Sequence, residues 1–273
     1  MRVALYGGPP ASLTRRRVAA AGVGMAMALA TLAALPATAT AVAPPTARPG
    51  GATGAVRDHT GVTPAAQTLG VDVNASQGNV DWPAAWADGA RFAYVEATEG
   101  TTYTNPYFAT QTAGASAVGM EHGAYHFANP NASSGQTQAD FFVAHGGGWS
   151  RDGQTLPPLL DIEASPFGDV CYGMSQAAMV TWLKNFTAEV RARTTRWPVI
   201  YTSTSWWTTC TGNDASFGAN DPLFVAGTSS GPGPLPAGWT TATFWQSTDS
   251  GVFPGGEDWF NGTPDQLKAF ADG

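Results

Sequence analysis

The sequence is poor in residues that hold metal ions. Its 273 residues include only two cysteines and four histidines, and these are scattered without the spacing of a zinc site. The chain also has no Gly-x-Ser-x-Gly elbow, no phosphate-binding loop and no dinucleotide fingerprint. We therefore expect neither a metal nor a cofactor, and a chemistry that relies on side chains alone.

Positive charge is scarce as well. The chain has 13 basic and 20 acidic residues, and 12% of it is charged against 43% hydrophobic. Four of the basic residues lie in the first 41 positions, so the rest has a formal charge of about −11. Such a surface repels nucleic acid, and no basic helix suited to a membrane surface is visible. We expect a monomer that binds neither nucleic acid nor, once processed, a membrane.

The first 41 residues contain no acid. A basic start, with Arg2 and three consecutive arginines from Arg15, precedes an apolar run over 18–35 and A-x-A cleavage sites near residue 39. We predict an export signal over residues 1–41 and a secreted protein, with the Sec and twin-arginine routes both open. An uncleaved anchor is the alternative, but the run is alanine-rich and marginal for spanning a membrane.

The segment after the signal has no hydrophobic periodicity. Residues 42–67 are rich in Pro, Ala, Gly and Thr, which is typical of a flexible linker. We therefore place the folded domain at 68–273. Both cysteines, Cys171 and Cys210, fall in this exported part, so we expect a disulfide between them. It would close a loop of roughly 40 residues and stabilise the fold by about 4 kcal/mol in the chain-entropy model.

The most informative stretch is Leu156 to Glu163, which we predict to be a short buried strand with two carboxylates at its far end. Residues two apart on a strand share a face, so Asp161 and Glu163 should project together while Ile162 packs behind them. Like charges so close push their pKa values apart, which provides the proton donor and the anion that glycosidic cleavage needs. The alternative is a strand end whose acids cap a helix or bind a cation.

Strands and helices alternate along most of the domain, which favours a parallel sheet closed into a barrel. The last third contains only strands and loops apart from a closing helix, so an incomplete, modified TIM-like barrel fits better than a regular one. We predict strands at 70–73, 91–98, 123–127, 156–163, 198–201, 223–226 and 243–246, and helices at 80–90, 107–118, 136–145, 175–190 and 264–270.

Several polar residues come at the carboxyl ends of these strands, where barrels place their active sites. They are Asp72, Glu96, His126, Asp161, Glu163 and Tyr201. His126 lies in an apolar strand, so a core role is favoured over a catalytic one. Tyr125 and Tyr201 are candidates to bind substrate, and Trp206, Trp207 and Trp245 are equally suited to sugar platforms or to the core.

Seven segments together carry a family resemblance. They are Gly70-Val71-Asp72-Val73 with Gln77-Gly78, Glu96-Ala97-Thr98-Glu99-Gly100, Gly123-Ala124-Tyr125-His126-Phe127-Ala128, Leu159-Leu160-Asp161-Ile162-Glu163, Val199-Ile200-Tyr201-Thr202, Phe244-Trp245-Gln246 and Phe260-Asn261-Gly262. In this order they resemble the family 25 glycoside hydrolases, secreted lysozymes that act as N-acetylmuramidases, over roughly residues 69–263. The two cysteines also match positions that are bridged in similar bacterial members.

The resemblance implies a single-domain α/β fold, a modified TIM-like (β/α)5(β)3 barrel with three antiparallel final strands. It implies retaining hydrolysis of the β-1,4 bond between N-acetylmuramic acid and N-acetylglucosamine in bacterial peptidoglycan. By position, Glu163 would be the general acid/base, and Asp161 would orient the substrate's own N-acetyl group as internal nucleophile. Asp72 and Asp258 would be the other acids of the site.

Departures from the family pattern lie on the expected rim of the site. Glu96 replaces a usual Lys, Asn74 and Ser76 replace Ser and an aromatic residue, Gly227 replaces a His, and the motif around Asp258 is shortened. We list Glu96 and Trp245 with the two tyrosines as substrate-binding candidates, and expect Glu96 to raise the pKa of a nearby acid. Two alternatives stay open, a saccharide-binding pseudoenzyme and a chitinase-like hydrolase. The acidic run of the main chitinase family is absent, however, because Leu156 and Leu159 occupy two of its Asp positions.

Overall fold

The computed structural model describes residues 66–166 and 168–273. The predicted export signal and nearly all of the predicted linker lie outside these residues. Within them, no helix combines the length and apolarity needed to cross a membrane.

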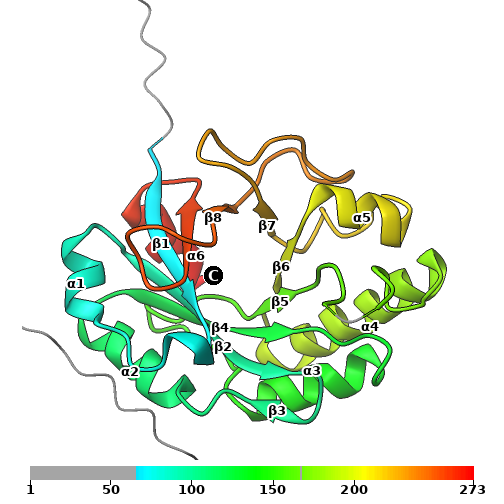
Figure 1. Cartoon of the computed structure of the whole chain (residues 1–273), viewed down its shortest axis with the longest axis horizontal. Coiled ribbons are helices and arrows are strands. Elements are labelled where there is room, and N and C mark those ends of the chain that lie inside the picture. The colour runs from blue at the N-terminus through cyan, green and yellow to red at the C-terminus, as the bar shows by residue number, and fades with distance from the viewer. Residues whose placement is uncertain (1–65, 167) are drawn as a thin grey trace, which may run out of the picture. The chain divides into compact units, whose positions relative to one another are not determined.

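Eight strands of one sheet close into a barrel (Figure 1). The sheet order is β1-β9-β8-β7-β6-β5-β4-β2, and β1 also pairs with β2, which closes the ring. A short ninth strand, β3, forms a hairpin on the outer end of β2. The bounds are β1 Thr68–Val73, β2 Phe92–Glu99, β3 Tyr103–Thr104, β4 Glu121–Phe127, β5 Leu159–Asp161, β6 Val199–Thr202, β7 Leu223–Ala226, β8 Phe244–Thr248 and β9 Gly256–Phe260.

A helix follows each of the first five barrel strands, and a sixth ends the chain (Figure 1). They are α1 Trp82–Ala87, α2 Phe108–Ala117, α3 Gly135–Ala144, α4 Gln176–Thr194, α5 Thr204–Thr211 and α6 Pro264–Asp272. Five strand-helix units followed by three strands make the (β/α)5(β)3 barrel, so the predicted fold class is confirmed.

The final strands differ from the expectation of three antiparallel ones. β7 and β8 run parallel to the strands before them, and only β9 is antiparallel to both neighbours, β8 and β1. The prediction that the last third contains no helix before the closing one was also wrong. Ser203 caps α5 by accepting a hydrogen bond from the Trp206 amide, and a buried side holds Trp206, Trp207 and Cys210. This helix is only eight residues long, so its periodicity is hard to detect.

The longest helix, α4, follows directly from its sequence. Ser175 is its N-cap and accepts a hydrogen bond of 3.3 Å from the Ala178 amide. The apolar side chains at helical spacing, from Met179 to Val190, are all buried. A disulfide joins Cys171, just before α4, to Cys210 in α5, with 5.3 Å between the Cα atoms. The predicted bridge is confirmed, and it fixes the chain that leads from the barrel rim into α4.

Aromatic side chains fill the barrel interior. Phe244 lies at its centre, with ring centroids 5.2 Å from Phe92 and 5.1 Å from Phe260. The same cluster takes in Tyr94 from β2 and Phe224 from β7. Because these rings close the interior, a cavity can form only where the strands end.

Candidate active site

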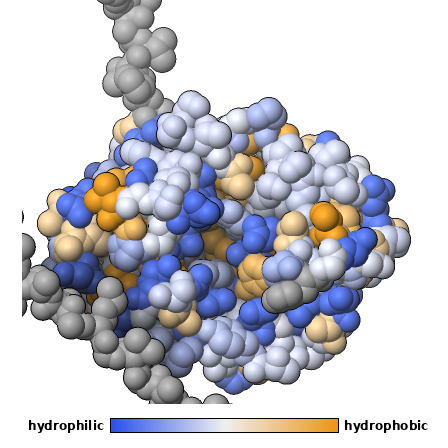
Figure 2. Space-filling model, in the orientation of Figure 1, coloured by the Kyte–Doolittle hydropathy of each residue, from blue (hydrophilic) through white to orange (hydrophobic). Residues whose placement is uncertain are grey.

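One cavity opens at the carboxyl end of the strands. Its volume is about 400 Å³, and Figure 2 shows a hollow on this face with hydrophobic surface at its bottom and hydrophilic residues around it. The lining residues come from seven of the eight barrel strands and the turns that follow them. They are Asp72, Asn74, Tyr94, Glu96, Tyr125, Phe127, Leu159, Asp161, Glu163, Tyr201, Phe224, Gln246 and Asp249.

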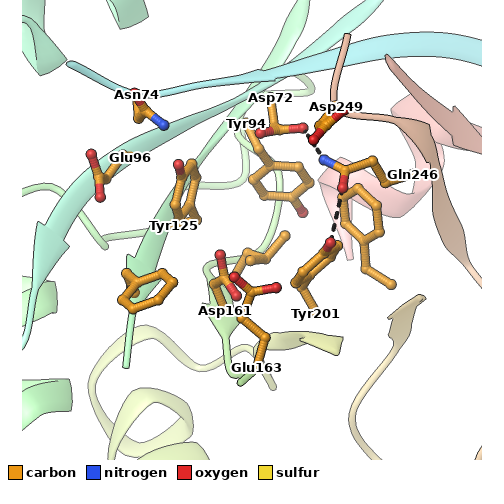
Figure 3. A pocket seen from close by; sticks show the side chains of 13 residues that line it. Asp72, Asn74, Tyr94, Glu96, Tyr125, Asp161, Glu163, Tyr201, Gln246 and Asp249 are labelled. Carbon is orange, nitrogen blue, oxygen red and sulfur yellow. Dashed lines mark hydrogen bonds between the residues drawn. The ribbon is translucent and has the colours of Figure 1, made fainter. Parts of the chain in front are cut away.

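Asp161 and Glu163 lie side by side in this cavity (Figure 3). The strand that carries them is shorter than predicted, because β5 ends at Asp161 and Glu163 lies beyond it. Pro157 and Pro158 lack the amide hydrogens that would extend the strand backwards. The backbone beyond β5 is still held, since the amide of Ile162 donates to the carbonyl of Tyr201 at 3.0 Å and its side chain is fully buried. Ile162 therefore anchors the turn that presents both acids.

The environment of this pair favours the protonated form. Burial raises the pKa of Asp161 well above its usual range, and the charges of Glu163, Asp72 and Glu96 raise it further. Oδ1 of Asp161 is buried and has no hydrogen-bond partner among the described residues. Burial, followed by the charge of Asp72, also raises the pKa of Glu163. The two carboxyl groups titrate as a pair, so one proton can be held between them at neutral pH.

Asp72 is held by residues from the far end of the chain. Nε2 of Gln246 donates to Oδ2 of Asp72 at 2.6 Å, and the hydroxyl of Tyr201 donates to Oε1 of Gln246 at 2.9 Å (Figure 3). Burial raises the pKa of Asp72 to about 6, the bond from Gln246 lowers it, and the charge of Asp249 raises it. Asp72 is therefore poised to change its charge at mildly acidic pH.

Glu96 lies on the other side of the cavity, near Asn74 and Tyr125 (Figure 3). Its pKa is raised to about 7, first by burial and then by the charge of Glu99, while a hydrogen bond from the backbone of Ala75 lowers it. Glu96 also contributes to the raised pKa of Asp161, as the sequence predicted for a nearby acid. The acids of the cavity thus act on one another electrostatically.

Two predicted site residues do not reach the cavity. Trp245 is buried on the opposite face of β8 from Gln246, where its ring stacks on Trp259 at 6.1 Å. Strand alternation places Gln246, not Trp245, toward the cavity. Asp258 is fully buried in β9 beside Gln246 and Gly70. Burial and then the charge of Asp72 raise the pKa of Asp258 well above its usual range, and neither carboxylate oxygen has a partner in the described chain.

His126 is a core residue, in line with the favoured interpretation. It is fully buried, with Nδ1 2.8 Å from the hydroxyl of Thr98 and Nε2 3.0 Å from Oε1 of Gln138. Burial lowers its pKa to about 4, so the ring is neutral at neutral pH. Trp206 and Trp207 are buried as well and pack between helix and barrel.

Three polar lining residues, Tyr94, Gln246 and Asp249, were not among the candidates. The hydroxyl of Tyr94 donates to the carbonyl of Pro157 at 3.1 Å. Gln246 follows Trp245, the residue that was selected as a candidate. Adjacent residues of a strand point to opposite faces, and this alternation along β8 was the signal that would have identified Gln246. Asp249 follows the carboxyl end of β8, the position that had singled out Asp72 in β1. In the described part of the chain, no group of three or more His, Cys, Asp or Glu side chains is arranged to hold a metal ion.

Comparisons with known proteins agree with this geometry. The model of the glycosyl hydrolases family 25 matches residues 71–256. An N,O-diacetylmuramidase from Arthroderma benhamiae is 46% identical over 211 residues, 77% of this chain and 89% of that protein. Lysozyme M1 from Streptomyces globisporus is 46% identical over 208 residues, 74% of this chain and 71% of that protein. A solved family GH25 lysozyme from Aspergillus fumigatus has a TM-score of 0.75 and 45% identity, and the match covers 76% of this chain and 100% of that one.

Proposed function

The chain belongs to glycosyl hydrolase family 25, and we propose that it is a secreted lysozyme that cleaves the β-1,4 bond between N-acetylmuramic acid and N-acetylglucosamine with retention. The observation that carries the assignment is the Asp161–Glu163 pair. Both carboxyl groups face one cavity at the carboxyl end of a barrel, and both have raised pKa values. A proton held by such a pair is available to a glycosidic oxygen at neutral pH.

Glu163 is the general acid in this proposal. It protonates the glycosidic oxygen, so that the bond to the anomeric carbon breaks and the leaving sugar departs as an alcohol. Glu163 lies beyond the end of β5, whereas Asp161 is part of this strand and its Oδ1 is buried, so Glu163 is the acid better placed to exchange its proton with substrate and water.

Asp161 orients the N-acetyl group of the muramic acid residue, whose carbonyl oxygen attacks the anomeric carbon as the bond to the leaving group breaks. The acetamido N–H donates to Asp161, which stabilises the positive charge that develops on the cyclic intermediate. Glu163, now ionised, then removes a proton from a water molecule that opens the ring. Two inversions at one carbon give net retention.

The remaining residues of the site support these steps. Tyr125 and Tyr201 line the cavity and offer hydroxyl groups to the sugar. Ionised Asp72 adds negative charge near the oxocarbenium-like transition state. Burial raises the pKa of Tyr201, and the charges of Asp161, Glu163, Asp72 and, last, Asp258 raise it further, so Asp258 acts on the site electrostatically. Trp245 supports Gln246 from the outer face of β8. Substrate contact by Trp245 would require movement of the strand.

We also propose how the protein is exported, which state it adopts and what it binds. The signal over 1–41 directs export, the linker over 42–67 separates it from the catalytic barrel at 68–273, and the mature enzyme works as a monomer. Its acidic surface keeps it from nucleic acid and anionic membranes, and peptidoglycan is the partner.

The test is turnover of purified peptidoglycan, with mass spectrometry of the released fragments, for wild type, Glu163→Gln and Asp161→Asn. Loss of general acid catalysis should lower kcat by about 10²- to 10⁴-fold in Glu163→Gln. Glu121→Gln is the matched control, because Glu121 starts β4 at the opposite end of the barrel. The products of the wild type should carry N-acetylmuramic acid at their reducing ends in the β configuration.

Other outcomes would identify the alternatives. Binding of glycan without any release of reducing ends would indicate a saccharide-binding pseudoenzyme. Cleavage of chitin oligosaccharides in preference to peptidoglycan would indicate a chitinase-like enzyme. An α-configured first product would contradict retention and place a water molecule, not the N-acetyl group, as the nucleophile.

A further inference from the structure

All the charged side chains that line the cavity are acidic. Of its 13 lining residues five are carboxylic acids, and none is Lys, Arg or His. Peptidoglycan itself carries carboxylates, because its peptide chains contain free carboxyl groups. A cavity with only acidic charges repels such groups unless protons or cationic groups offset the charge. Two of the acids, Asp161 and Glu163, are accounted for by the proposed catalysis, and Asp72 has Gln246 as its partner.

Glu96 has no side-chain partner of this kind in the described part of the chain. The residue is 9% exposed and its side chain faces the cavity, where it accepts a hydrogen bond from the backbone of Ala75 but forms no ion pair and no hydrogen bond with another described side chain. The charge of Glu99 lies close enough to disfavour its ionisation. A nearly buried carboxylate without a cationic partner is unfavourable in the free protein, and becomes favourable when a ligand brings the missing charge.

The backbone around Glu96 is rigid and well supported. Nδ2 of Asn105 donates to the carbonyl of Glu96 at 2.9 Å and also to Oε1 of Gln111 at 2.9 Å. Nε2 of Gln111 in turn donates to the carbonyls of Asn74 and Gly78 at 2.8 and 2.9 Å. Both amide side chains are buried. This end of the cavity is therefore organised before any ligand arrives.

An ammonium group on the sugar matches this end of the cavity. A neutral hydroxyl would donate one hydrogen bond to Glu96 and leave the charge of its carboxylate in place. An ammonium group donates a hydrogen bond and also neutralises that charge. Tyr125 lies beside Glu96 in the cavity, and its aromatic ring suits a cation as well. A primary amine appears in peptidoglycan sugars where an N-acetyl group has been removed.

We propose that Glu96 forms a subsite for the free amine of an N-deacetylated glucosamine residue, so that this enzyme accepts partly deacetylated peptidoglycan. The inference rests on the function proposed above. It concerns glucosamine and not muramic acid, because the muramic N-acetyl group is the nucleophile of the proposed reaction and is regenerated when water opens the cyclic intermediate. Removal of that group would stop the reaction.

The experiment uses one peptidoglycan preparation in two forms, fully N-acetylated and enzymatically deacetylated on glucosamine. The measured quantity is the ratio of kcat/KM on the deacetylated form to kcat/KM on the acetylated form. Glu96→Gln should lower this ratio by about tenfold, through KM, because a charge-assisted hydrogen bond becomes a neutral one. Glu96→Asp should restore part of the ratio, and Glu96→Lys should lower it further.

Asp249→Asn is the matched control, since it removes one negative charge from the other side of the cavity. Its ratio should fall by much less than that of Glu96→Gln. Equal ratios in wild type and Glu96→Gln, or equal falls in Glu96→Gln and Asp249→Asn, would overturn the subsite.

Failure of the proposed function gives a different result. In that case the wild type releases nothing from either form, and calorimetric binding of the two glycans to Glu163→Gln replaces the kinetic ratio. Tighter binding of the deacetylated glycan that is lost on adding Glu96→Gln would support the subsite, and equal binding of both glycans would overturn it.

Discussion

Asp72 and Gln246 are 174 residues apart in the sequence and are joined by a hydrogen bond of 2.6 Å in the site. Asp72 lies one residue before the end of β1, the first barrel strand, and Gln246 lies in β8. β9 pairs with both of these strands. Because the barrel closes through β9, the beginning and the end of the chain meet at this bond. The pKa of Asp72, and with it the charge of the cavity, depends on that closure.

Gln246→Leu should shift the acidic limb of the pH profile upward. The bond from Gln246 favours ionised Asp72, so its loss raises the pKa of Asp72 above the present value of about 6. Ionised Asp72 then stabilises the transition state only at higher pH. The measurement is kcat/KM on peptidoglycan between pH 4 and 8, with Gln136→Leu, on the surface of α3, as control. An unchanged profile would show that Asp72 does not control the acidic limb.

Gly256→Ala should separate Asp72 from Gln246. A methyl group at this position would overlap Oδ2 of Asp72 and Nε2 of Gln246. Displacing such packed groups costs about 1–3 kcal/mol, so we expect that loss in urea unfolding, together with reduced turnover. Gly148→Ala is the matched control, because nothing lies within 4 Å of the added methyl group there. Equal stability of the two variants would contradict the prediction.

His126 should make the protein less stable in acid. Burial lowers its pKa from 6.5 to about 4, so between these pH values the unfolded chain binds the proton and the folded one does not. The contribution of His126 to the free energy of unfolding therefore falls as the pH decreases from 6.5 to about 4, by about 3 kcal/mol in total.

Buried carboxyl groups with raised pKa, such as Asp72, act in the opposite direction, so the comparison must be between variants. The unfolding free energy of wild type minus that of His126→Gln should decrease from pH 7 to pH 4. His145→Gln, which alters an exposed histidine, is the control. A difference that stays constant with pH would mean that His126 is not the group responsible.

The disulfide should contribute strongly to stability. Replacing Cys171 and Cys210 together by Ser releases a loop of roughly 40 residues in the unfolded chain, a loss of about 4 kcal/mol in the chain-entropy model. For a domain of this size the melting temperature should fall by about 10 °C. Calorimetry of the oxidised wild type and the double variant measures this, and the reduced wild type should melt close to the variant. A fall of less than about 2 °C would contradict the prediction.

The parallel strands, and every helix except the short α5, were predictable because their signals are local. Ser175 and the apolar spacing that follows it define the start and the buried side of α4 wherever the helix lies. The acids at strand ends could also be proposed early, since carboxyl ends of parallel strands meet at one rim. By contrast, β9 was not recognised as a strand from its own residues, because it is short and carries Glu257 and Asp258, which disfavour strands.

The sequence by itself determined the barrel class, the disulfide and the identity of the Asp161–Glu163 pair, because spacing and residue type are enough for each. Only the tertiary structure decided that Gln246 faces the cavity while Trp245 does not, and that Asp258 is buried without lining it. It also decided which acids hold protons, because a pKa is set by burial and by neighbouring charges. Those surroundings are assembled from strands at opposite ends of the chain, so no local stretch of sequence contains them.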